Sequence, residues 1–170
     1  MLLVGITATE ISGTTFADSA DLAGVTVPLR GTALQRWKVV FRVHTTGWWQ
    51  DPATAVEADV AKRLELHYFH DISVADFITA TDLGFKRQCS DVEFQALKPR
   101  IDRWNALYAN IKEGQRYRIT YIPGSGTELA KDGVSLGTIE GADFGKYMIG
   151  IWIGEKPVEA GHRKDLIDGK

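Results

Sequence analysis

The chain has 170 residues, of which 44% are hydrophobic and 25% charged, and its formal net charge is −2. These values predict one globular domain over residues 1–170 with a core of its own. They provide no basic field that would attract nucleic acid or an anionic membrane surface. Cys89 is the only cysteine, which excludes an intramolecular disulfide and a thiolate metal cage.

No segment is long and apolar enough to predict a membrane span. The start of the chain, MLLV at residues 1–4, is too short for a signal peptide and lacks a basic region. Either the protein is cytoplasmic, or a leader preceding Met1 has been removed.

The first 50 residues predict strands. VTVPLRG (25–31) leads into WKVVFRVHTTGWW (37–49), in which Val39, Phe41 and Val43 share one face. A turn follows at DPAT (51–54), and a short helix is possible over TAVEADVAK (54–62). The next strand, over residues 62–70, places Leu64, Leu66 and Tyr68 on one face.

Two helices are predicted next. The first begins at Ser73, with Asp76 as a weak capping box and a modest stripe of Phe77, Ala80 and Leu83. The second begins at Ser90, with Glu93 completing a capping box. Its apolar residues recur at three- and four-residue steps: Phe94, Leu97, Ile101, Trp104, Tyr108 and Ile111. Pro99 lies inside this stripe and predicts a kink or a break.

The segment YIPGSGTELAKDG (121–133) resembles a glycine-rich phosphate loop, but its Lys131 does not follow the required glycine and no helix begins after it. Alternation before it and the Pro123-Gly124 and Asp132-Gly133 pairs predict a strand meander with tight turns. A helix over residues 141–154 and a short helical turn at 162–168 close the chain. Because strands and helices are segregated, we predict the α+β class, with a largely antiparallel sheet and helices packed on one face.

No hydrolase, zinc-protease or redox motif is present. His67 and His70 fall on opposite faces of their strand, so we expect no metal site, and we expect no cofactor. The region of Arg36, His44 and the tryptophans stands out. Arg36 is either a surface charge or a residue that points into an apolar cavity and binds an anionic head group, a role that suits its planar guanidinium.

The ordered motifs of the carboxy-terminal half resemble the bacterial chalcone isomerase-like proteins. They comprise Gly114, Tyr121, Pro123-Gly124, Gly126-Thr127, Asp132-Gly133, Ile139, Gly141, Asp143-Phe144, Ile151-Trp152, Gly154 and Pro157. GTALQRWKVVFRVHTTGWW (31–49) and LELHYFHDISVADF (64–77) resemble amino-terminal segments of the same family. The resemblance implies an antiparallel sheet with helices on its concave side and a cleft between them. The family is mostly found with a secretory leader, which implies a periplasmic location if one was removed here.

The resemblance also assigns site positions. The arginine with which plant chalcone isomerases hold the phenolate falls on Arg36, and their threonine falls on His44. Their tyrosine falls on Phe77 and their asparagine near Gly84, so neither keeps its polar group. The non-catalytic branch binds fatty acids through an arginine, which Arg36 fits, and a tyrosine, whose place His44 takes.

These observations leave three hypotheses. The first is a non-catalytic binder of a fatty acid or similar amphipathic anion, with Arg36, His44, Phe77 and Tyr121 as candidate ligand-binding residues. The second is an isomerase or lyase-type enzyme that acts on a chalcone-like or other enolisable substrate, with Arg36 stabilising developing charge. The third is an interaction module, because adjacent strand residues face opposite ways and at least one of Trp48 and Trp49 is then open to a partner.

Overall fold

A computed structural model describes residues 7–38 and 40–168. The chain start at Met1 and the predicted strand position Val39 lie outside the described residues. The strands are β1 (Ala8–Ile11), β2 (Thr14–Ala17), β3 (Ser19–Leu22), β4 (Val25–Trp37), β5 (Phe41–Trp49), β6 (Lys62–Tyr68), β7 (Arg116–Ile122), β8 (Gly126–Lys131) and β9 (Val134–Ile139). The helices are α1 (Val74–Gln88), α2 (Asp91–Asn105), α3 (Ala142–Ile153) and α4 (Ala160–Asp168).

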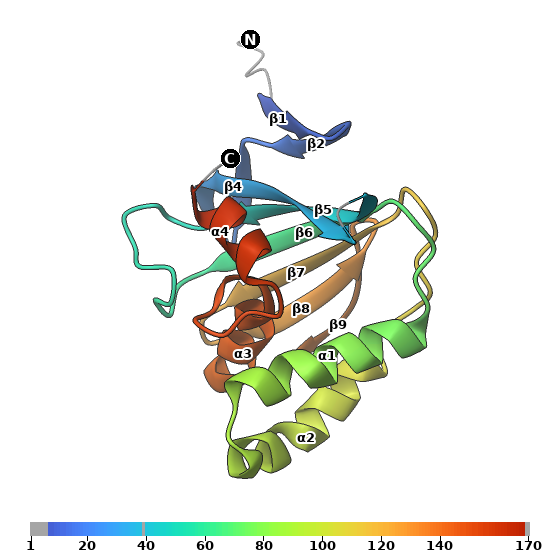
Figure 1. The fold of residues 1–170 in the computed structure, drawn as a ribbon. Helices are drawn as coiled ribbons and strands as arrows, with labels where there is room; N and C mark the ends of the chain where they lie inside the picture. The colour runs from blue at the N-terminus through green and yellow to red at the C-terminus, as the bar shows by residue number, and fades with distance from the viewer. Residues whose placement is uncertain (1–6, 39, 169–170) are drawn as a thin grey trace.

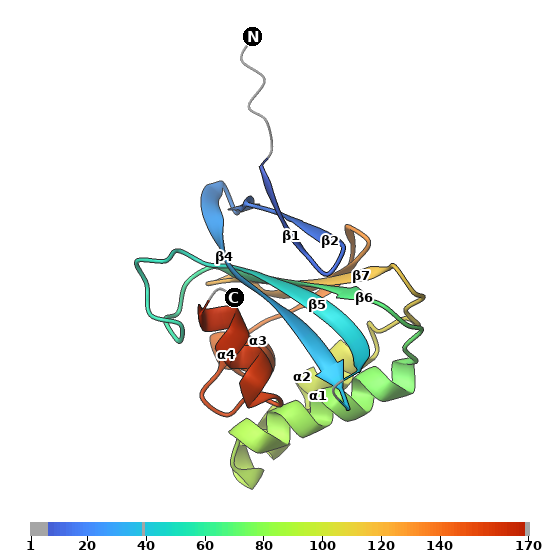
Figure 2. The same cartoon turned by 45° about the horizontal axis from the view of Figure 1, so that its top comes forward.

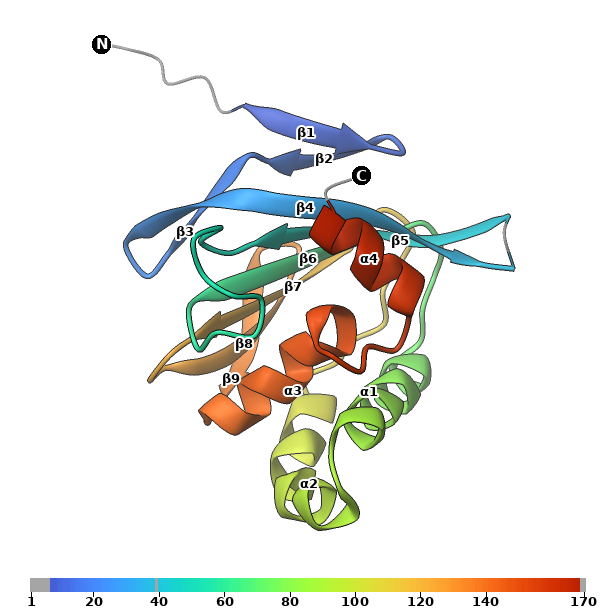
Figure 3. The ribbon, with the colours of Figure 1, turned by 60° about the vertical axis from the view of Figure 1, so that its left-hand side comes forward.

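Strands β3 to β9 form one antiparallel sheet in sequence order, and β1 pairs with β2 in a separate hairpin. Figure 1 shows the twisted sheet with its helices. In Figures 2 and 3 the helices lie on one side of the sheet and the β1–β2 hairpin on the other. The predicted α+β class, with an antiparallel sheet and helices on one face, is confirmed.

The helix starts follow their caps. Ser73 and Ser90 each accept the backbone N–H of the residue three positions on, and Asp76 and Glu93 return the bond, so both predicted capping boxes are present. The break at Pro99 is absent, and α2 is one helix. Pro99 is exposed, so the backbone carbonyl that loses its N–H partner can bind water there.

Two local predictions are wrong. Residues 54–61 form turns and bends in place of a helix. The buried stripe of α1 consists of Phe77, Thr81, Gly84 and Phe85, whereas Ala80 and Leu83 are exposed. The stripe is rotated because α3 packs closely on α1 at Gly84, where an added Cβ would lie 2.5 Å from Ile151 Cγ1.

The two faces of the sheet carry separate cores. The prediction that one of the two tryptophans of β5 is exposed is therefore wrong. Trp48 is 0% exposed and packs on the helix side. Trp49 faces the other side and is 3% exposed, because Phe16 of β2 covers it with ring centroids 6.0 Å apart. Trp49 Nε1 also donates to the backbone carbonyl of Ala17 at 2.9 Å. The interaction-module hypothesis therefore loses the exposed edge on which it rested.

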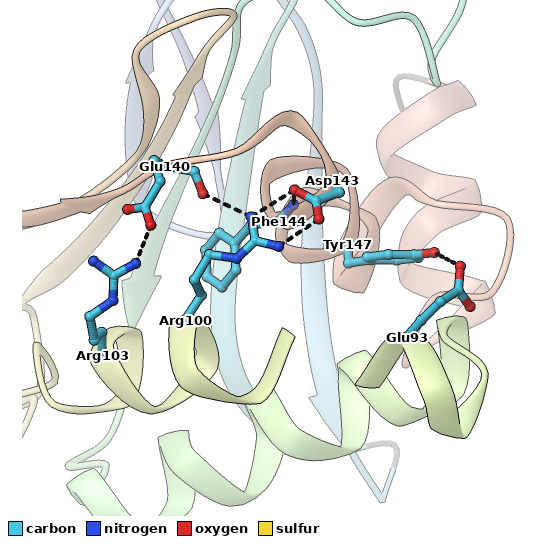
Figure 4. A network of polar contacts seen from close by, with 7 residues as sticks. All are labelled: Glu93, Arg100, Arg103, Glu140, Asp143, Phe144 and Tyr147. Atoms are coloured by element: carbon cyan, nitrogen blue, oxygen red, sulfur yellow. Dashed lines mark hydrogen bonds and ion pairs between the residues drawn. The ribbon is translucent and has the colours of Figure 1, made fainter. Parts of the chain in front are cut away.

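Polar contacts hold α2 against the start of α3 (Figure 4). Arg100 donates from both terminal nitrogens to the Asp143 carboxylate, at 2.7 and 2.6 Å, and the guanidinium holds the pKa of that carboxyl below its usual value. Arg103 pairs with Glu140, and the Tyr147 hydroxyl donates to Glu93 at 2.9 Å. This network fixes the helix layer, and with it one wall of the site described next.

Candidate functional site

A cavity of about 340 Å³ lies between the helix-facing side of the sheet and the helices α1, α3 and α4. Most of its lining is apolar or aromatic: Trp37, Val43, Leu66, Ile72, Phe77, Ala80, Tyr117, Ile119, Leu129, Ile151, Trp152 and Val158. The volume falls in the range of small-molecule sites. The strands reach this cavity with every second residue, as the alternating burial of β6 shows.

A row of polar side chains crosses the sheet at this cavity. Gln35 of β4 is paired with His44 of β5, and His44 is paired with Tyr68 of β6. Residues directly opposite in an antiparallel sheet share a face, so the three side chains lie side by side. All three line the cavity. We call Gln35, His44 and Tyr68 the polar row.

Arg36 lies elsewhere. It is exposed and is not among the residues that line the cavity. A register shift follows Gln35, so that Arg36 is paired with Arg42. The Arg42 guanidinium lies over the Phe69 ring and donates to the Ser12 carbonyl in the hairpin turn on the far side of the sheet. The position that faces the cavity is Gln35, and a role for Arg36 in ligand binding stays a prediction.

His44 is connected to α4 through a threonine. The Thr46 hydroxyl lies 3.1 Å from His44 Nδ1 and 3.1 Å from His162 Nε2. Burial lowers the pKa of His44 well below its ordinary value, and the neighbouring His162 lowers it further. Burial also lowers the pKa of His162 to about 4. Both imidazoles are therefore neutral at pH 7, and the Thr46 hydroxyl donates to one and accepts from the other.

The tyrosines that line the cavity differ in how their hydroxyls are satisfied. The Tyr117 hydroxyl donates to the Ala109 carbonyl at 2.6 Å and accepts the Ala109 N–H at 2.8 Å. The Tyr108 hydroxyl accepts from Trp104 Nε1 at 2.8 Å and lies 2.7 Å from Thr81 Oγ1. The Tyr68 side chain is 6% exposed, and its hydroxyl has no hydrogen-bond partner among residues 7–38 and 40–168. Burial raises its pKa well above the usual value, so it is a neutral donor.

The structure separates the candidate residues predicted from the sequence. His44 and Phe77 line the same cavity, and Phe77 stacks on Tyr108 with ring centroids 5.1 Å apart. Tyr121 lines a different cavity of about 510 Å³, beside α3 and the loop before β6, where its hydroxyl donates to Asp59. Gly84 is a packing position and does not line the site.

Sequence reasoning missed Gln35, Tyr68, Tyr108 and His162 as site residues. Tyr68 had a usable signal, because it shares the alternating face of Leu64 and Leu66. Gln35 shares a strand face with the buried Ala33 and is paired with His44, but an uncharged amide in a strand carries no functional signal of its own. His162 reaches the site only through the packing of α4 on the sheet.

Comparisons with known proteins agree on the fold. A family model described as chalcone isomerase-like matches residues 8–168. The structure is similar to the crystal structure of a fatty-acid binding protein from Arabidopsis thaliana, with a TM-score of 0.73 and 16% sequence identity. The match covers 95% of this chain and 96% of the other. No curated protein matches the sequence. Within the described residues, none of the helices has the length and hydropathy to cross a membrane.

Proposed function

The chain belongs to the chalcone isomerase-like family, and from this premise we propose that it binds an amphipathic small molecule without transforming it. The apolar part of the molecule lies in the cavity between the sheet and α1, and its polar end lies at the polar row. The observation that carries the proposal is the apolar cavity of about 340 Å³ that meets convergent polar side chains at one place.

Two further observations support a binding role. A fatty-acid binding protein shares this fold over nearly the whole chain. The Tyr68 side chain is buried at the cavity wall, and its hydroxyl has no hydrogen-bond partner in the described part of the chain. A bound molecule with an acceptor oxygen would supply that partner.

A fatty-acid anion with its carboxylate on Arg36 is the ligand that the sequence resemblance implies. Arg36 is exposed and lies outside the cavity lining, so the binding proposal does not depend on it. The apolar chain is the part of such a ligand that the cavity accommodates, and the head group is a separate question.

The substitution Ala80→Trp tests the binding site directly. Ala80 is an exposed residue of α1 that lines the cavity, so an indole at this position would occupy ligand space without disturbing the core. We expect at least a tenfold loss of affinity for a decyl-chain amphiphile, measured by displacement of a fluorescent probe, with the melting temperature nearly unchanged.

The control is Ala75→Trp, which adds the same side chain to an exposed α1 residue outside the lining. This variant should bind as the wild type does. Equal binding by wild type and Ala80→Trp would place the ligand elsewhere, and the cavity of about 510 Å³ beside α3 would be examined next.

Chalcone cyclisation is not expected. The plant-type reaction that the resemblance describes uses an arginine to hold a phenolate, whereas the described residues lining this cavity include no arginine or lysine, and its histidines are neutral. Incubation with a panel of hydroxylated chalcones should give the spontaneous rate at every protein concentration. A rate that increases with protein concentration and is absent in Ala80→Trp would establish the enzymatic alternative.

A further inference from the structure

We propose that the cavity selects a ligand whose polar end is uncharged, such as a long-chain alcohol, ester or ketone, over the carboxylate of the same chain. The inference rests on the proposed function and names the ligand class of the same site. Three features of the described residues carry it: the absence of a cation from the lining, the carboxylates present there, and the neutral donors of the polar row.

The first feature is the charge of the lining. Among the described residues that line the cavity, none is a lysine or an arginine. Burying a carboxylate away from water is costly unless a positive charge or several hydrogen-bond donors compensate. The strand position that could supply a guanidinium here is Gln35, an uncharged amide, and the adjacent Arg36 is not among the described residues that line the cavity.

The second feature is the presence of acidic groups. Asp76 and Glu159 also line the cavity, and both are exposed residues. Hydrogen bonds from Ser73 in the capping box hold the pKa of the Asp76 carboxyl below its ordinary value, so it is ionised at neutral pH. A ligand carboxylate entering beside these groups meets charge of its own sign, which disfavours it.

The third feature is the set of donors. The Tyr68 side chain is buried, and its hydroxyl, which has no partner within the described residues, can donate one hydrogen bond to a ligand oxygen. The Nδ1 atom of His44 is engaged with Thr46, which leaves Nε2 as its other ring nitrogen for the ligand. The carboxamide of Gln35 donates to the Arg36 carbonyl at 3.1 Å and keeps an oxygen that can accept from a hydroxyl. Together these groups can form hydrogen bonds with one uncharged oxygen-containing group, such as a hydroxyl or a carbonyl.

Chain-matched ligands test the proposal on the full-length wild-type protein at pH 8, where a fatty acid is ionised. We would measure the affinities of decanol, methyl decanoate and decanoate by probe displacement and by calorimetry. Decanol or methyl decanoate should bind at least tenfold more tightly than decanoate. Tighter binding of decanoate would overturn the head-group inference and leave the proposed function standing, whereas no binding of any of the three would overturn both.

Exchanging the residues at positions 35 and 36 tests the head-group preference more sharply. The double variant Gln35→Arg with Arg36→Gln keeps the net charge and moves the guanidinium onto the position that faces the cavity. The ratio of decanoate affinity to decanol affinity should rise at least tenfold. A folded double variant with unchanged preference would overturn the inference, because the missing cation would then not decide selection.

A hydroxyl deletion keeps the proposal testable if that double variant does not fold. Tyr68→Phe should weaken decanol about tenfold, because it removes the unpartnered donor. The matched control Tyr147→Phe removes a hydroxyl that donates to Glu93 at a residue outside the lining of this cavity, so it should leave decanol affinity unchanged. Equal decanol affinity in wild type and Tyr68→Phe would show that the polar row does not bind the head group.

Discussion

Gly31→Ala is expected to lower the free energy of unfolding by about 3 kcal/mol or more, the upper end of the usual cost of overpacking. Gly31 lies on β4 where α4 crosses the sheet. A Cβ at this position would lie 1.8 Å from the backbone carbonyl oxygen of Leu166. Both partners of the clash are fixed to regular elements, so the strain is relieved only if α4 moves away from the sheet. Chemical denaturation at pH 7 measures the loss.

The same substitution should also weaken ligand binding, because α4 carries His162, which lines the cavity and holds Thr46. Gly161→Ala is the matched control. Gly161 is in α4, and nothing lies within 4 Å of its added Cβ. This change should raise stability by roughly 0.5–1 kcal/mol, because glycine is a poor helix former. Equal stabilities of wild type and Gly31→Ala would contradict the close docking of α4.

Lowering the pH from 7 to 5 is expected to remove about 2 kcal/mol of stability through His162 alone, and His44 adds a loss of the same sign. Their pKa values in the folded protein are depressed below 6.5, chiefly by burial. The unfolded chain then binds protons that the folded one does not, so stability falls as the pH drops below 6.5. For His162 this loss continues down to about pH 4, its value in the folded protein.

The neighbouring groups do not cancel this effect. Asp165 acts to raise the pKa of His162, but burial outweighs it. Tyr68, which contacts the His44 ring, is neutral throughout this range. His67, whose pKa is lowered by partial burial and by Arg116, adds a smaller loss of the same sign. The surface carboxyls with depressed pKa values, such as Asp143, lose their contribution only nearer their ordinary pKa, below pH 5.

Denaturation curves at pH 7, 6 and 5 for the wild type and for His162→Gln measure the pH effect. The variant should lose about 2 kcal/mol of the pH dependence, because the His162 imidazole is gone. A wild-type stability that stays constant from pH 7 to pH 5 would contradict the buried, neutral pair at the cavity.

The fold followed closely from local signals in the sequence. The capping boxes at Ser73 and Ser90 marked the helix starts, and the Asp132-Gly133 pair marked the last hairpin. Each of these signals consists of residues a few positions apart, so it can be recognised from the sequence alone. The burial of Trp49 could not be predicted from the sequence, because Phe16, which covers it, belongs to a hairpin distant in the sequence.

The candidate site could be predicted from the sequence only in part. The family resemblance gave His44 and Phe77 as candidate positions, and both line the cavity, but it assigned the arginine role to Arg36 and passed over the neighbouring Gln35, whose side chain lines the cavity. An arginine beside apolar residues suggests an anion-binding site, whereas a glutamine in the same place suggests no particular function. The structure shows that Gln35 is the residue that lines the cavity, and the expected ligand chemistry changes with it.

Native mass spectrometry of the purified protein, followed by solvent extraction, tests the central claim most directly. Wild type should carry a single-chain amphiphile with an uncharged polar end, either as purified or after incubation with decanol, and Ala80→Trp should carry none. Wild type and Ala80→Trp that hold the same adduct, or that both stay free of ligand after decanol and decanoate are added, would contradict the account of this cavity as the binding site.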